Sequence, residues 1–217
     1  MLKQDVYLGV QYFFAKNELK ALFKDSLPDD IQPNSFKSNI GSLGLFTDWD
    51  KRNSFFTADK GFRVNILYTL NDNWTGSDFE YQKLSGALNW FIPLQKNWIS
   101  GFRLEANQVF GDPPFYAFPS LALRGVPAVN YQGYTTALVE TEQRLDFNLR
   151  WSAVAFAGFG KTFQRDESAS ESQTAYNVGG GFRYLIARVF KIRAGIDIAA
   201  GPDSFGWYIV FGHNWNR

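Results

Sequence analysis

The chain has no cysteine, one histidine and one methionine among its 217 residues. Without thiols it has no disulfide scaffold, no thiolate metal site and no cysteine-based catalysis. A single histidine excludes a multi-histidine metal site. The 22 Lys and Arg nearly balance the 21 Asp and Glu, so no global basic field favours nucleic acid. We therefore predict no cofactor, no metal and no nucleic-acid partner.

Long hydrophobic runs are also missing. A helical membrane span needs a run of about 18 or more apolar residues, and none occurs. Transmembrane β-strands need only about 9–11 alternating residues, so they stay possible. What the chain has in abundance is aromatic residues, 18% of the total, combined with a mean hydropathy of -0.25. Large rings therefore alternate with charged and polar residues.

Apolar and polar residues alternate with a period of two along most of the chain. In 99–110, for example, Phe102 and Leu104 are apolar while Arg103 and Glu105 are charged. This spacing puts successive side chains on opposite faces of a strand. About ten segments show it: 4–14, 38–49, 60–70, 79–92, 97–110, 135–147, 150–163, 174–186, 189–200 and 204–215.

These segments predict an all-β fold, an antiparallel transmembrane β-barrel of about ten strands in one domain, 1–217. The segments exceed the usual strand length of about 5–6 residues, and short turns alternate with long loops, as in outer-membrane barrels. The seven tryptophans lie near segment ends, as interfacial girdles require. They are Trp49, Trp74, Trp90, Trp98, Trp151, Trp207 and Trp215. A soluble β-sandwich or lipocalin-like barrel also alternates and is the alternative.

Two long connections interrupt the pattern, at 15–37 and 111–134. In the first, Leu19, Leu22 and Phe23 fall at helical spacing, and Pro28 would stop a helix. We interpret 15–37 as a rim loop with one or two helical turns rather than as a partner-binding helix.

Motifs for catalysis are weak. The segment 155–162 (AFAGFGKT) ends like a phosphate-binding loop but lies within a predicted strand. Glu140 and Glu142 share one strand face. We interpret them as salt-bridge partners of interior arginines rather than as a glycosidase-like pair. We therefore do not expect an enzyme.

The second connection carries a sharper signal. Its centre, 123–126 (LRGV), puts Arg124 beside Gly125 inside a hydrophobic loop. A buried arginine needs a carboxylate partner. If the loop folds back into a lumen, Glu140 or Glu142 on the next strand could pair with Arg124. Alternatively, Arg124 caps an exposed loop.

Three motifs occur in a fixed order along 38–217. They are the turn residues Asp50, Arg52, Asn53 and Gly61, the loop Arg124-Gly125 followed by Glu142-Gln143-Arg144 and 155–160 (AFAGFG), and the terminal strand with Gly212 and Trp215. Together they resemble the BamA/TamA superfamily of outer-membrane barrels, the surface-antigen family. The resemblance implies a location in the bacterial outer membrane, a lumen-plugging loop at 111–134 locked by Arg124 and Glu142, and a terminal strand kinked at Gly212.

The chain also departs from the family pattern. Val126 stands where an aromatic residue is usual, and Gly158 stands where the family has a carboxylate partner for the arginine. The family barrel has sixteen strands, so ten strands correspond to the C-terminal part of such a barrel or to a shortened version.

For function, the resemblance implies insertion, assembly or translocation of proteins by lateral opening at the terminal strand, with the lipid bilayer and outer-membrane protein clients as partners. A structural or channel-forming barrel without clients is one alternative. The membrane anchor of an enzyme whose catalytic domain lies outside this chain is another.

Overall fold

The computed structural model describes residues 6–19, 36–165 and 172–215. These contain ten strands, at the positions that the alternation predicts. The strands are β1 (Val6–Leu19), β2 (Phe36–Asp50), β3 (Gly61–Asn71), β4 (Tyr81–Gln95), β5 (Trp98–Gly111), β6 (Thr135–Asp146), β7 (Trp151–Phe163), β8 (Thr174–Ala187), β9 (Ile192–Ala200) and β10 (Phe205–Phe211). Three short 3₁₀ helices lie in the connections: η1 (Asn73–Thr75), η2 (Phe115–Ala117) and η3 (Ala128–Asn130). Within the described part, no helix is long and apolar enough to cross a membrane.

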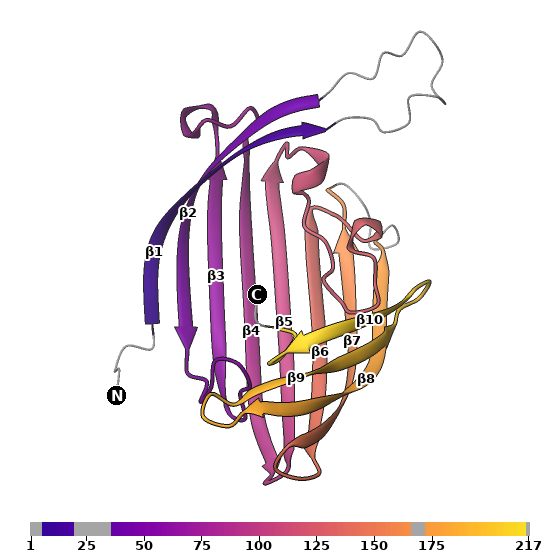
Figure 1. Cartoon of the computed structure of the whole chain (residues 1–217). Coiled ribbons are helices and arrows are strands. Elements are labelled where there is room, and N and C mark those ends of the chain that lie inside the picture. The colour runs from indigo at the N-terminus through magenta and orange to yellow at the C-terminus, as the bar shows by residue number, and fades with distance from the viewer. Residues whose placement is uncertain (1–5, 20–35, 166–171, 216–217) are drawn as a thin grey trace.

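The strands form one antiparallel sheet in sequence order, β1 to β10. Every neighbouring pair is an up-and-down hairpin, and the sheet curves around an interior (Figure 1). Within the described residues, no ladder joins β1 to β10. The predicted all-β, antiparallel barrel architecture is confirmed.

The two faces of the sheet differ sharply in chemistry. On the outer face, large apolar side chains such as Phe102, Phe159 and Ile198 are exposed. On the inner face, charged side chains such as Arg103 and Arg183 are buried. This is the reverse of a soluble barrel and matches an apolar exterior in lipid with a polar interior.

The connections also differ between the two ends of the sheet. Turns 96–97, 147–150 and 188–191 lie at one end, whereas loops 72–80 and 112–134 lie at the other (Figure 1). The longer connection between β2 and β3, 51–60, lies at the short-turn end. Since outer-membrane barrels have short periplasmic turns, the short-turn end corresponds to the periplasmic side.

The C-terminal strands turn inward across the interior (Figure 1). Glycines on the inner face of β8 and β9 allow this close approach. A Cβ added to Gly181 would lie 2.2 Å from the Ile196 carbonyl oxygen, and one on Gly195 would lie 1.7 Å from the Phe182 oxygen. No other residue fits at either position without moving the neighbouring strand.

Two local predictions are wrong. Strand β1 continues to Leu19, where helical spacing was expected, because it pairs with β2 along its whole length. The rest of the predicted loop, 20–35, lies outside the described residues. Trp215 is buried in the interior instead of standing in an interfacial girdle, and β10 ends at Phe211.

Candidate functional site: the ionic cluster around the interior loop

The loop after β5 runs back into the interior (Figure 1). Its apolar residues hold it there: Leu121, Leu123 and Val126 pack with Leu138 of β6 and Ala175 of β8. Burying such side chains stabilises the loop by about 1.5–3 kcal/mol each. Val126, which replaces the aromatic residue usual in the family, is thus part of a small apolar cluster.

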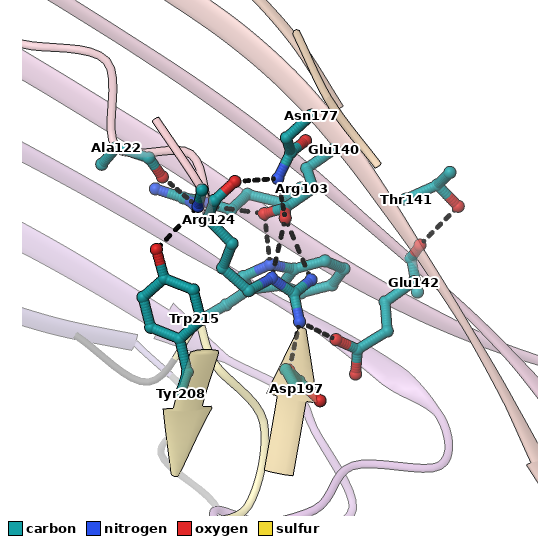
Figure 2. Close-up of polar contacts among 12 residues, drawn as sticks. Arg103, Ala122, Arg124, Glu140, Thr141, Glu142, Asn177, Asp197, Tyr208 and Trp215 are labelled. Carbon is teal, nitrogen blue, oxygen red and sulfur yellow. Dashed lines mark hydrogen bonds and ion pairs between the residues drawn. The ribbon is translucent and has the colours of Figure 1, made fainter. Parts of the chain in front are cut away.

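Arg124 lies at the tip of this loop among three carboxylates (Figure 2). Its Nη2 is 2.9 Å from Glu140 Oε1, and its Nη1 is 2.8 Å from both Glu142 Oε2 and Asp197 Oδ2. Burial alone would lower the pKa of Arg124, but Glu142, Glu140 and Asp197 outweigh it and raise the pKa. Arg124 therefore stays charged.

A ring completes the site of this guanidinium. The Cζ atom of Arg124 lies 3.3 Å from the centroid of the Phe156 ring on β7. An arginine stacked on an aromatic face keeps its in-plane N–H donors free for carboxylates. Phe156 thus fixes the plane in which Arg124 meets its three acidic partners.

Two further arginines extend the cluster. Arg103 Nη1 donates to the Ala122 carbonyl at 3.1 Å and to Glu140 Oε2 at 3.4 Å. Arg183 Nη2 donates to Asp197 Oδ2 at 2.9 Å. With Arg124, three cations therefore pair with Glu140, Glu142 and Asp197, and Arg103 also pairs with Glu105 at the edge of the cluster. Buried charges are tolerated when they are paired and hydrogen-bonded in this way.

The loop is also fastened to the β9–β10 hairpin. The Gly125 amide donates to the Tyr208 hydroxyl at 2.7 Å, and the Ser204 hydroxyl donates to the Gly125 carbonyl. Gly125 has a φ of 77° and faces Ala199, where a Cβ would approach the backbone to 2.9 Å. Glycine is therefore required beside Arg124 on two grounds.

Sequence reasoning placed Arg124, Gly125, Glu140 and Glu142 together, and the structure brings them into contact. It missed Asp197. The resemblance left one carboxylate partner of the arginine vacant at Gly158, and Asp197 of β9 supplies a carboxylate from another strand. The available signal was the isolated acid in the otherwise apolar and basic strand 192–200.

The turn residues Asp50, Arg52, Asn53 and Gly61 form a separate unit between β2 and β3. Arg52 Nη2 is 2.7 Å from Asp50 Oδ2. The Asn53 side-chain oxygen accepts from the amides of Asp59 at 2.9 Å and Lys60 at 3.2 Å. Gly61 has a φ of 102°, which closes the turn. These contacts are local and account for the motif as a folded connection.

The segment after β10, 212–215, connects the turn unit with the ionic cluster. Its backbone turns at Gly212, which has a φ of 75°. The His213 amide donates to the Phe56 carbonyl at 3.0 Å, and the Trp215 Nε1 donates to Glu140 Oε2 at 2.7 Å (Figure 2). The three motifs, far apart in sequence, thus meet inside the sheet.

His213 is buried and stacks on Phe91, with ring centroids 4.5 Å apart. Burial, followed by the positive charges of Arg52, Arg144 and Arg183, lowers its pKa from 6.5 to about 3. The imidazole is therefore neutral at physiological pH. Its Nε2 accepts a hydrogen bond from the Ala58 amide at 3.4 Å.

Chemically, the cluster is a network of buried ion pairs. Every acid in it accepts from an arginine. Among the described residues, no group of three or more His, Cys, Asp or Glu side chains could hold a metal ion.

These features define a class: an outer-membrane-type β-barrel with an interior loop whose arginine, Arg124, pairs with acids of the barrel strands. A family model, the Omp85 superfamily domain, matches residues 4–117. The chain belongs to the Omp85 superfamily, whose barrels reside in the outer membrane, and the sequence resemblance is confirmed.

The fold is also similar to that in the crystal structure of BamA from Haemophilus ducreyi lacking POTRA domains 1–3. The two chains are 14% identical, with a TM-score of 0.68 over 95% of this chain and 51% of the BamA chain. This chain thus spans about half the length of that structure. No curated protein sequence matches it.

Proposed function

We propose that this barrel assists the insertion, assembly or translocation of proteins in the outer membrane, with β10 as the strand that receives a client. Membership of the Omp85 superfamily supports a task in this membrane. Barrels of this superfamily are generally non-enzymatic, and the proposed mechanism requires no covalent chemistry.

One observation carries the proposal: within the described residues β10 pairs with β9 alone, so its outer edge has no partner. An unpaired edge offers backbone N–H and C=O groups to an incoming strand. The side chains of β10 that alternate outward, Phe205, Trp207, Ile209 and Phe211, are exposed. A client strand added there would extend the apolar outer surface.

The loop and β10 are coupled in this mechanism. Tyr208 of β10 accepts from the Gly125 amide, and Asp197 of β9 pairs with Arg124. We propose that Arg124 with Glu140 and Glu142 locks the loop and thereby holds the β9–β10 hairpin in place. Gly212 provides the bend at which the terminal segment departs from the strand.

Cross-linking in proteoliposomes tests the proposal. The chain has no cysteine, so Ile209→Cys introduces a single thiol on β10. An unfolded outer-membrane β-barrel protein with one cysteine in a strand is added, and its folding is followed by protease resistance. We expect faster folding than in empty liposomes and a disulfide to Cys at position 209.

Leu104→Cys is the matched control, because Leu104 is exposed on the outer face of β5, which is paired on both sides. It should give no disulfide with the client. Folding no faster than in empty liposomes would contradict the proposal. That result would favour a structural barrel without clients, or an anchor for an enzyme domain.

A further inference from the structure

The short-turn end of the sheet contains a cavity of about 700 Å³. It lies on the inner side and is lined by all four connections of that end: 51–60, 96–97, 147–150 and 188–191. Its volume is in the range of sites that bind small ligands, about 300–1,000 Å³. We call it the mouth pocket.

Positive charge is concentrated in the mouth pocket. Its lining contains six cations but only two acids, Asp59 and Asp146. The cations are Lys60, Lys96, Arg144, Arg188, Lys191 and Arg193. The excess of four charges here contrasts with a net charge of +1 for the entire chain. The pocket is thus a local basic site on a nearly neutral protein.

The two acids are already engaged. Asp59 is 2.6 Å from Lys191 Nζ and also pairs with Arg144. Asp146 is 3.1 Å from Arg144 Nε and 3.3 Å from Arg193 Nη2. Three cations therefore share two carboxylates. Positive charge remains in excess even among the paired groups.

The other three cations have no acidic partner in the described residues. Lys60, Lys96 and Arg188 are exposed, and each comes from a different connection. Cations spread over three connections suit several negative charges along an extended chain better than one compact anion. The lining also contains apolar residues, among them Ile99, Leu149 and Leu185.

A second observation indicates a missing partner. The Thr57 hydroxyl is buried at the mouth pocket and has no hydrogen-bond partner within the described residues. A buried hydroxyl without a partner is costly, and native proteins usually satisfy such groups. A ligand oxygen that reached this hydroxyl would accept from it.

We propose that the mouth pocket binds an acidic peptide segment from the periplasm, with carboxylates at Lys60, Lys96 and Arg188 and apolar side chains between them. Buried inner-face residues such as Arg144 and Arg193 line the pocket on the side away from the lipid-facing surface, which favours a peptide over a lipid headgroup. The site does not depend on client addition at β10, so either proposal can fail alone.

A fluorescent peptide of alternating glutamate and leucine tests the site by anisotropy, with the full chain in uncharged detergent at low salt. The key variant is Lys60→Gln/Lys96→Gln/Arg188→Gln. We expect it to bind the peptide about tenfold or more weakly, since each lost charge pair removes a several-fold contribution. Thr57→Val, which keeps the side-chain shape, should weaken binding by a smaller factor.

The matched control is Lys16→Gln/Lys37→Gln/Arg165→Gln, which removes three exposed cations at the long-loop end. Heat-dependent gel mobility verifies that both triple variants are folded. The proposal would be overturned if both triple variants weakened peptide binding equally. It would also be overturned if a glutamine–leucine peptide bound as tightly as the glutamate–leucine peptide. Displacement of the peptide by phosphatidylglycerol vesicles or inorganic phosphate at low concentration would assign the pocket to phosphate groups and also overturn it.

Discussion

Asp197 Oδ2 accepts a hydrogen bond from Arg124 Nη1 at 2.8 Å, across 73 residues of sequence. The same carboxylate accepts from Arg183. One acid on β9 therefore joins the loop arginine to a β8 arginine. The sequence resemblance places a carboxylate at the position of Gly158, on β7, whereas in this chain β9 supplies the acid Asp197.

Asp197→Asn should destabilise the barrel, because Arg124 and Arg183 would lose a buried counter-charge. Removing one partner of such a pair costs about 3–5 kcal/mol. Gly158→Asp should not restore stability, since its Cβ would lie 2.5 Å from Asn177 Oδ1 and 2.9 Å from Leu123 Cδ2. The temperature at which the folded gel band disappears measures both effects. Full rescue by Gly158→Asp would contradict this expectation.

Arg124→Ala should loosen the interior loop, because Glu140, Glu142 and Asp197 would then face one another with less positive charge. We expect the folded band to disappear at a lower temperature and the loop 112–134 to be cleaved faster by protease. Arg124→Lys should recover only part of the loss, since one ammonium cannot reproduce the planar fork. Unchanged melting and proteolysis in Arg124→Ala would refute the lock.

Trp215→Phe isolates the hydrogen bond from Trp215 Nε1 to Glu140. The phenyl ring can still pack with Ala58 and Phe91, so most of the apolar contact remains. A lost hydrogen bond to a buried charged acceptor costs about 1.5–3 kcal/mol. We expect a smaller decrease in melting temperature than for Trp215→Ala. Equal decreases in both variants would show that packing alone matters.

Acid should weaken the structure through His213. Its pKa is about 3 in the folded chain against an ordinary value of 6.5, so the unfolded chain binds the proton first as the pH falls. Stability attributable to His213 is complete above about pH 6.5 and decreases toward pH 3, by up to about 1.4 kcal/mol per pH unit.

His213→Gln provides the comparison, because the amide oxygen can still accept from the Ala58 amide and does not titrate. Melting temperatures at about pH 7 and about pH 4.5 should differ less for this variant than for the natural chain. The groups around the imidazole are Arg52, Arg144, Arg183 and Asp59. The same pH dependence in both chains would assign the acid effect to carboxylates such as Asp59.

The strands were predictable because burial on one face and lipid on the other impose a period of two. Arg103 and Phe102 show why the sequence did not tell which face was inside: alternation is identical for a soluble barrel. Only the structure, in which Arg103 is buried, shows that the charged face is the inner one.

The ionic cluster was predictable in part. Arg124 with Glu140 and Glu142 follows from a loop that adjoins the next strand in sequence. Asp197 comes from a distant strand, and its contact depends on how far β9 turns inward. The prediction for Trp215 was wrong for a similar reason. The sequence alone does not distinguish a terminal aromatic residue at a membrane interface from one buried in the interior.

The close contact of β8 and β9 has a thermodynamic consequence. Gly181 and Gly195 admit this contact because they lack side chains, and glycine loses more backbone freedom on folding than any other residue, about 0.5–1 kcal/mol relative to alanine. Forming this close contact of β8 and β9, which places Asp197 beside Arg124, thus costs conformational entropy. The ion pairs of the cluster offset that cost. The β8–β9 contact and the ion pairs therefore stabilise each other and should be lost together on unfolding.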